Sequence, residues 1–242
     1  MMASHRGLSE HRRDTSVHLT ALYQPVVHLK TGQVIAVEAL VRIVGSQCSP
    51  EEWFQRAELE GTGPVAEVAA ARAALRGVRE LPAGLPFAVN FSAAALIGTE
   101  ACGMLLPYAE RLVVELTERS RTEDFQALRS ALAPLRAAGA QLALDDVGAG
   151  YANFQHFSQL RPEILKIDRS VTAGLVTDHV SRAFAAALVD FAAAVGAHVT
   201  AEGVETTAEM RAARELGVTS AQGYLLGRPG PPASVRGHAT RA

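Results

Sequence analysis

Short apolar runs alternate with longer stretches in which apolar positions recur at helical spacing. The runs expected to form strands are Ala21–His28, Val34–Ile43, Phe87–Phe91, Leu112–Leu116, Gln141–Asp145, Ile164–Ile167, Val199–Glu202 and Ser220–Tyr224. The stretches expected to form helices are Pro50–Leu59, Val65–Arg79, Asp124–Ala138, Val180–Val195 and Thr206–Leu216. This alternation predicts an α/β protein, either a barrel or an open doubly wound sheet.

The first two apolar runs break the alternation, because only the turn Leu29–Gln33 separates them. They are expected to form a hairpin, which makes the first strand antiparallel to its neighbour. A chain of 242 residues also has about the length of one (β/α)8 barrel. We therefore expect a barrel with one reversed strand. The predicted organisation is a flexible arm at 1–18, a barrel domain at 19–232 and a tail at 233–242.

Composition narrows the class of protein. Hydrophobic residues make up 48% of the chain and charged residues 20%, which is typical of a globular protein. The net charge of −2 gives no overall field for long nucleic acids. Two cysteines, Cys48 and Cys102, form no disulfide framework and fit a cytoplasmic protein. Asp190 interrupts the most apolar stretch, Ala183–Val199, so we expect no membrane association.

Polar side chains fall where the apolar runs end. In a parallel barrel, the carboxyl ends of the strands share one face, and catalytic groups lie there. These side chains are therefore expected to converge, with Glu38 reaching the site from within the second strand. The group comprises Glu38, Asn90, Glu115, Asp145, Asp146, Lys166, Asp168, Glu202, Glu205 and Gln222.

The acids indicate a metal site. Carboxylates among apolar neighbours are costly unless a cation neutralises them. Oxygen ligands without histidine or cysteine suit Mg²⁺ or Mn²⁺. Asp145 and Asp146 suit a pair of ions, which together activate water and stabilise a leaving oxygen. Lys166 is one of only two lysines beside 21 arginines, and lysine is able to transfer a proton where arginine is not.

Each residue also has a simpler interpretation. Glu115 and Glu118 are suited to the start of a helix. Asp145 and Asp146 before a glycine are common turn chemistry. Lys166 fits a lysine whose stem is buried and whose charge reaches water. Asp168 is better explained as a partner of the backbone or of an arginine than as a ligand.

Eight ordered motifs resemble one known family, the EAL domain, over nearly the whole chain. They are YQPVV (Tyr23–Val27), EALVR (Glu38–Arg42), NFS (Asn90–Ser92), ELTE (Glu115–Glu118), DDVGAGY (Asp145–Tyr151), LKIDRS (Leu165–Ser170), TAEGVET (Thr200–Thr206) and AQGYLLGRP (Ala221–Pro229). The resemblance implies a modified TIM barrel with an antiparallel first strand. It also implies a phosphodiesterase that opens cyclic di-GMP to linear pGpG with two divalent cations, Mg²⁺ or Mn²⁺.

The resemblance implies a role for each matching residue. The metal ligands would be Glu38, Asn90, Glu115, Asp145 and Asp146. The catalytic group would be Lys166, which orients or deprotonates the attacking water, Gln222, which positions it, and Glu202, which supports the second metal site. The substrate-binding residues would be Arg42, which pairs with a phosphate, Gln24 and Glu205. Glu118 would fix the loop after Asp145.

Three departures from the family pattern define the alternatives. Val147 replaces the usual phenylalanine, and Ala152–Asn153 replace two serines. The stretch from Ser92 to Leu112 is short for the family. Val147 and Ala152–Asn153 lie in the loop that follows the paired aspartates. Changes in this loop affect the expected turnover and the expected homodimer. The main alternative is therefore a weak or inactive cyclic di-GMP receptor acting through protein partners, and a nucleotide-free scaffold is the third. The retained acids and Lys166 favour the hydrolase.

Overall fold

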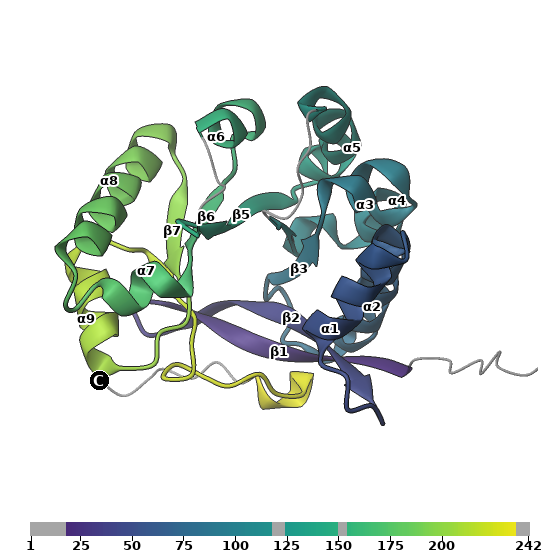
Figure 1. Ribbon diagram of the computed structural model, residues 1–242, viewed down its shortest axis with the longest axis horizontal. Helices are drawn as coiled ribbons and strands as arrows, with labels where there is room; N and C mark the ends of the chain where they lie inside the picture. The colour runs from purple at the N-terminus through teal and green to yellow at the C-terminus, as the bar shows by residue number, and fades with distance from the viewer. Residues whose placement is uncertain (1–17, 118–123, 150–153, 236–242) are drawn as a thin grey trace, which may run out of the picture.

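The eight strands close into a barrel in chain order (Figure 1). The computed structural model describes residues 18–117, 124–149 and 154–235. The strands are β1 (His18–His28), β2 (Val34–Val44), β3 (Phe87–Phe91), β4 (Leu112–Leu116), β5 (Gln141–Val147), β6 (Ile164–Ile167), β7 (His198–Ala201) and β8 (Ser220–Ala221). The closed barrel confirms the predicted fold class and excludes the open doubly wound sheet.

The first strand runs against the rest, as predicted. β1 pairs antiparallel with both β2 and β8, whereas every other neighbouring pair is parallel. The hairpin turn between β1 and β2 closes when His28 N donates to Gln33 O at 2.9 Å. Gly32 lies in this turn with φ of +70°, a conformation that glycine adopts without steric cost.

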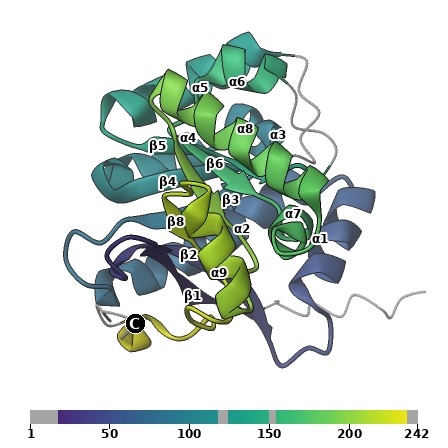
Figure 2. The same cartoon turned by 90° about the vertical axis from the view of Figure 1, so that its left-hand side faces the viewer.

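Helices pack against the outside of the barrel and lie to the left and to the right of the strands in Figure 1; Figure 2 shows the left-hand group from the front. The α-helices are α1 (Pro50–Leu59), α2 (Gly63–Gly77), α3 (Ala93–Gly98), α4 (Ala101–Leu105), α5 (Phe125–Ala137), α6 (Phe154–Leu160), α7 (Arg169–Gly174), α8 (His179–Val195) and α9 (Thr207–Glu215). The 3-10 helices are η1 (Val78–Glu80), η2 (Leu106–Arg111) and η3 (Pro232–Ser234). Among the described residues, no helix combines the length and the hydropathy that a membrane span requires.

The five predicted helices are present, but the pattern missed α3, α4, α6 and α7. These four helices have five to seven residues each, too few for a 3.6-residue period to show. Local capping defines two of them: Ser92 Oγ accepts from Ala95 N in α3, and Asp168 Oδ1 accepts from Ser170 N in α7. Asp168 therefore has the structural role that its sequence context favoured.

Inside the barrel, small apolar side chains form a layer directly below the polar strand ends. Ala88, Val113 and Ala143 make a buried cluster separate from the main core, with Ile164 packed against it. Residues two apart on a strand face the same side. The positions two residues further along these strands are therefore on the same inward face, and they hold Asn90, Glu115, Asp145 and Lys166.

Candidate active site

The polar side chains that follow this apolar layer are deeply buried. The exposed fraction is 2% for Lys166, 3% for Glu115, 5% for Gln222, 6% for Glu38 and 7% for Gln24. Each belongs to a different strand or strand end of the barrel. The barrel therefore brings together groups that are far apart in sequence, as the pattern of strand ends predicted.

Lys166 lies at the centre of the acids. Its Nζ atom is 2.7 Å from Glu202 Oε1, 2.9 Å from Glu115 Oε2 and 3.0 Å from Asp145 Oδ1. Glu38 Oε2 is 3.7 Å away. One ammonium group thus faces four carboxyl groups, and its single positive charge would not balance them if all four were ionised.

Two amide side chains donate to Glu38, and a third, Gln24, is joined to one of them. Asn90 Nδ2 donates to Glu38 Oε1 at 2.8 Å, and Gln222 Nε2 donates to Glu38 Oε2 at 2.5 Å. Gln222 Nε2 also reaches Gln24 Oε1 at 3.0 Å, and Gln24 Nε2 donates to Gly227 O at 2.9 Å. The buried oxygens Asn90 Oδ1 and Gln222 Oε1 have no hydrogen-bond partner among the described residues. Both are acceptors suited to a cation or to water.

A bulge in β5 explains how two adjacent aspartates reach one site. Neighbouring strand residues normally face opposite sides, but the β5–β6 register shifts between Leu144 and Val147. Asp146 has φ of +53°, which is uncommon for a residue with a side chain. As a result, carboxylate oxygens of Asp145, Asp146 and Glu202 lie within 4.8 Å of one another, close enough to share a cation.

Burial and mutual repulsion shift the pKa values of these groups. Burial, together with the charge of Glu38, raises the pKa of Glu115 well above its usual range. Burial also raises the pKa of Glu202 to about 8, despite Lys166. Burial favours a neutral Lys166, but the surrounding acids outweigh it and hold the lysine pKa well above 10.5. Burial opposes ionisation of Glu38 too, yet Lys166 and the amide donors lower its pKa.

The residues present fit divalent cations. Two of the acids carry raised pKa values, so without a metal the cluster retains protons that a cation would displace. Within the described ranges, the buried amide oxygens of Asn90 and Gln222 have no hydrogen-bond partner. The donors are all oxygens, which suits Mg²⁺ or Mn²⁺.

The remaining predicted residues lie further out or outside the described residues. Arg42 is half-buried at the edge of a small cavity that Asn90 also lines. Glu205 pairs with Arg169 Nη2 at 2.8 Å. Glu118 lies outside the described residues. Gln24 is inside the polar network, where its Oε1 atom accepts a hydrogen bond from Gln222.

Sequence reasoning missed the residues that shape the loop after β7. Gly203 has φ of +65°, and a Cβ atom there would lie 2.3 Å from the side chain of Arg169. A Cβ atom on Gly223 would lie 2.1 Å from Val204 O. The glycines directly after Glu202 and Gln222 were the available signal, because they permit this close approach.

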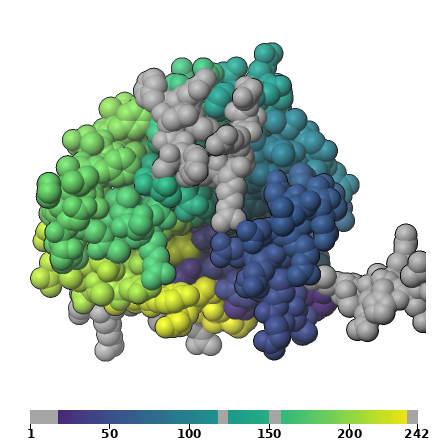
Figure 3. All heavy atoms as spheres, in the orientation of Figure 1, coloured from purple at the N-terminus to yellow at the C-terminus, as the bar shows by residue number. Residues whose placement is uncertain are grey.

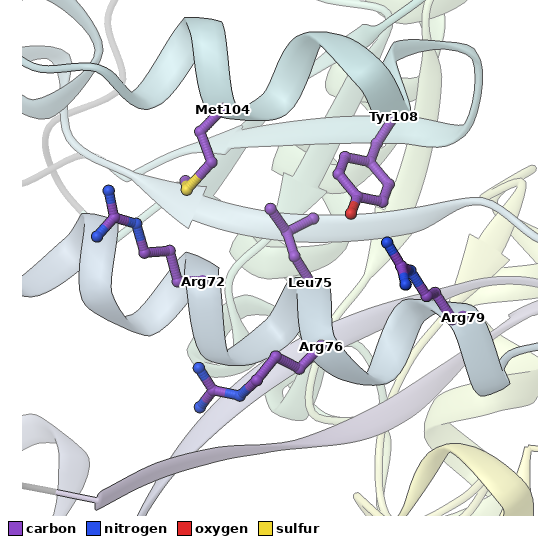
Figure 4. A pocket seen from close by; sticks show the side chains of 6 residues that line it. All are labelled: Arg72, Leu75, Arg76, Arg79, Met104 and Tyr108. Atoms are coloured by element: carbon purple, nitrogen blue, oxygen red, sulfur yellow. The ribbon is translucent and has the colours of Figure 1, made fainter.

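Outside this cluster, the outer wall of the barrel carries a groove. A groove of about 370 Å³ between α2 and the α4–η2 segment is lined by Arg72, Leu75, Arg76, Arg79, Met104 and Tyr108 (Figure 4). Arg72 in this groove pairs with Glu100, and Arg76 Nη2 donates to Leu19 O at 2.6 Å. None of the acids around Lys166 lines this groove. The face in Figure 3 is separately hollowed between α7, in green, and α1, in dark blue.

The fold and the site define a reversed-first-strand barrel with a lysine-centred acidic site at its strand ends. The chain belongs to the EAL domain family, whose model matches residues 9–229. It is 32% identical to the bifunctional diguanylate cyclase/cyclic di-GMP phosphodiesterase MucR of Pseudomonas aeruginosa over 91% of this chain. It is 31% identical to the cyclic di-GMP phosphodiesterase PA2567 of the same species over 86% of this chain.

Solved structures agree with this assignment. The PaMucR phosphodiesterase in complex with c-di-GMP matches with a TM-score of 0.77 and 32% identity, covering 88% of this chain and 97% of that one. Klebsiella pneumoniae BlrP1 with manganese and cyclic di-GMP matches with a TM-score of 0.79 and 27% identity, covering 89% and 57%. The chain spans 34% of MucR and 38% of PA2567, about a third of these curated relatives.

Proposed function

We propose that this chain is a metal-dependent phosphodiesterase that hydrolyses cyclic di-GMP to linear pGpG. The observation that carries the proposal is the imbalance of charge at Lys166, where one buried ammonium faces four carboxylates. Relatives named as cyclic di-GMP phosphodiesterases supply the substrate. The barrel domain, which we place at 19–232, would act in the cytoplasm, as a homodimer.

Two divalent cations, Mg²⁺ or Mn²⁺, would complete the site. Glu38, Asn90, Glu115 and Asp145 would hold one ion, and Asp146 and Glu202 would complete the second site. When bound, the ions would lower the pKa of water and offset charge on the leaving 3′ oxygen. Asn90 Oδ1 has no hydrogen-bond partner in the part of the chain that the structure describes, which supports the assignment of Asn90 as a ligand.

The chain's own residues would handle the proton and the substrate. Lys166 is held charged by the acids, and a cation that neutralised those acids would lower its pKa toward a value useful for proton transfer. Gln222 would orient the attacking water through Oε1, which has no protein partner among the described residues. Arg42 would pair with a phosphate oxygen, with Gln24 and Glu205 completing the substrate contacts.

The test is incubation of the purified chain with cyclic di-GMP and Mg²⁺ or Mn²⁺, with the products separated by chromatography. Glu38→Ala, checked for folding by circular dichroism, is the matched control. A metal-dependent linear product that Glu38→Ala does not form supports the hydrolase. Tight nucleotide binding without product points instead to the receptor and to the loop around Val147. Light scattering of the same sample tests the homodimer.

A further inference from the structure

Glu67 is a half-buried carboxylate in α2 that takes no part in the acidic cluster at Lys166. Its Oε2 atom accepts a hydrogen bond from Ser92 N at 2.7 Å. Burial raises the pKa of this carboxyl group, and the bond to Ser92 opposes that shift. Both the backbone and the side chain of Ser92 bond this carboxylate, and its partial withdrawal from water calls for an explanation beyond solubility.

Ser92 lies two residues after Asn90, where β3 ends and α3 begins. Its Oγ atom accepts from Ala95 N at 3.1 Å and caps α3. Toward β4, the strand end is supported as far as Phe91, which pairs with Leu116, and Thr117 N donates to Phe91 O at 3.1 Å. Toward β2, in the described part of the chain, the ladder comprises only Val37–Phe87 and Glu38–Ala88. The backbone that carries Asn90 therefore extends past its ladder on that side.

Packing on the β2 side is also incomplete. A cavity of about 150 Å³ lies there, and Val89 and Asn90 line it together with Ala70, Ala71 and Ala74 of α2. Three alanines give α2 little side-chain volume against this part of the strand. This cavity takes the place of protein contacts that would otherwise fix the position of its lining. The bond from Ser92 N to Glu67 is thus a directional contact between α2 and the end of β3.

We propose that Glu67 is a positioning residue that holds Asn90 in register for metal binding by tethering Ser92. The inference rests on the proposed metal site, and it extends that site to a helix on the outer wall. Asn90 Nδ2 is already fixed on Glu38, so small shifts of the strand end would move Asn90 Oδ1 away from the cation. Partners of metal ligands typically contribute about 10- to 100-fold to metal affinity.

The primary test is Mn²⁺ binding to the metal-free full chain, measured by electron spin resonance and by calorimetry, without any turnover. We expect Glu67→Ala to bind Mn²⁺ about tenfold more weakly than wild type. Glu67→Gln keeps an acceptor oxygen and should stay within about threefold of wild type, because it loses only the charge assistance of the bond. Equal Mn²⁺ affinity in Glu67→Ala and wild type would overturn the positioning role.

Ser92 allows the same bond to be removed from its donor side. Ser92 has φ of −79°, which proline tolerates, so Ser92→Pro removes the N–H group while keeping the backbone conformation. Ser92→Ala keeps that N–H group but removes the hydroxyl, which caps α3 and also bonds Glu67. We expect Ser92→Pro to weaken Mn²⁺ binding about tenfold and Ser92→Ala to weaken it by about threefold or less, because the backbone bond to Glu67 remains. Equal weakening in both variants would contradict the proposal, and this pair decides the matter if Glu67→Ala does not fold.

A destabilised variant of the same helix separates positioning from stability. Leu75 is 8% exposed in α2, and Leu75→Ala removes core packing without touching Ser92. We expect its Mn²⁺ affinity to equal that of wild type. A loss as large as that in Glu67→Ala would show that any loosening of α2 is sufficient. Absence of Mn²⁺ binding by wild type would overturn the proposed function as well, whereas normal wild-type binding with unaffected variants overturns only the role of Glu67.

Discussion

Charged groups occur in two contrasting settings in this protein. On the surface, Arg72 pairs with Glu100, and their side chains are 56% and 66% exposed. In the barrel, Lys166 and the four carboxylates around it are between 2% and 17% exposed. The surface pair is balanced one to one, whereas the buried cluster has an excess of negative charge. The excess is what marks the interior as a site for a cation.

The two settings differ in what they contribute to the protein. An exposed ion pair is screened by water and contributes about 0 to 1 kcal/mol. A buried charge without its partner is strongly destabilising, so the cluster needs either Lys166, bound protons or a metal. The acidic cluster around Lys166 lowers stability when it is not neutralised, so its presence at the strand ends is explained by function and not by stability. Substitutions in the buried cluster should therefore have larger effects than substitutions in the surface pair.

Removing the buried cation should have the largest effect. Lys166→Met keeps the apolar stem but leaves four carboxylates without their ammonium partner. We expect the metal-free variant to lose about 3 to 5 kcal/mol of stability at pH 8, measured by urea unfolding. We also expect hydrolysis to fall by about 10²- to 10⁴-fold, the usual contribution of a proton-transfer group.

The stability loss in Lys166→Met should shrink when Mg²⁺ is added, because the ion replaces the missing positive charge. The lost activity should not return, because the ion does not replace the amine. A metal-free Lys166→Met variant as stable as wild type would mean that protons alone neutralise the acids.

The metal-free protein should become less stable as the pH rises. Glu202 has a pKa of about 8 in the folded protein against 4.5 ordinarily, so folding favours its protonated form. That contribution is fully present below about pH 4.5 and is lost as the pH rises toward 8. The raised pKa of Glu115 acts in the same direction. We therefore expect the Tm of the metal-free protein to fall between pH 5 and pH 8.

Mg²⁺ should reverse this trend. At a hundred times its Kd, the ion adds about 2.7 kcal/mol at pH 8. The gain should be smaller at pH 5, where protons compete for the same carboxylates. Scanning calorimetry over this range with and without Mg²⁺ gives the answer. A Tm that rises toward pH 8 without metal would contradict the raised pKa values.

The sequence predicted the barrel because apolar runs alternate with helical stretches over the length of one (β/α)8 barrel. It predicted the reversed first strand because the Leu29–Gln33 turn is too short for a crossover. It predicted convergence of Glu38, Glu115, Asp145, Lys166 and Glu202 because parallel strands share one face. It did not predict the bulge at Asp146, because two adjacent acids read equally well as a turn. Nor did it predict the tether at Ser92, because Glu67 lies in a helix 25 residues away and no spacing rule links them.

A smaller effect, of opposite sign for stability and for function, is expected at Asp146. Asparagine tolerates the φ of +53° found there and removes one negative charge from the neighbourhood of Asp145 and Glu202. We expect Asp146→Asn to raise metal-free stability by about 0.5 to 1 kcal/mol. Its Mn²⁺ affinity and activity should fall by about 10-fold or more. Wild-type metal affinity in this variant would remove Asp146 from the ligand set.

The smallest effect is expected on the surface, where Arg72→Ala removes the Arg72–Glu100 pair from α2. Because both side chains are more than half exposed, we expect stability to change by about 0.5 kcal/mol or less, with no change in Mn²⁺ affinity. Urea unfolding at low and high salt provides the measurement, since screening should reduce even this difference. A loss near that of Lys166→Met would show that burial does not separate the two settings. A loss of metal affinity with stability unchanged would show that α2 affects metal binding through a residue other than Glu67.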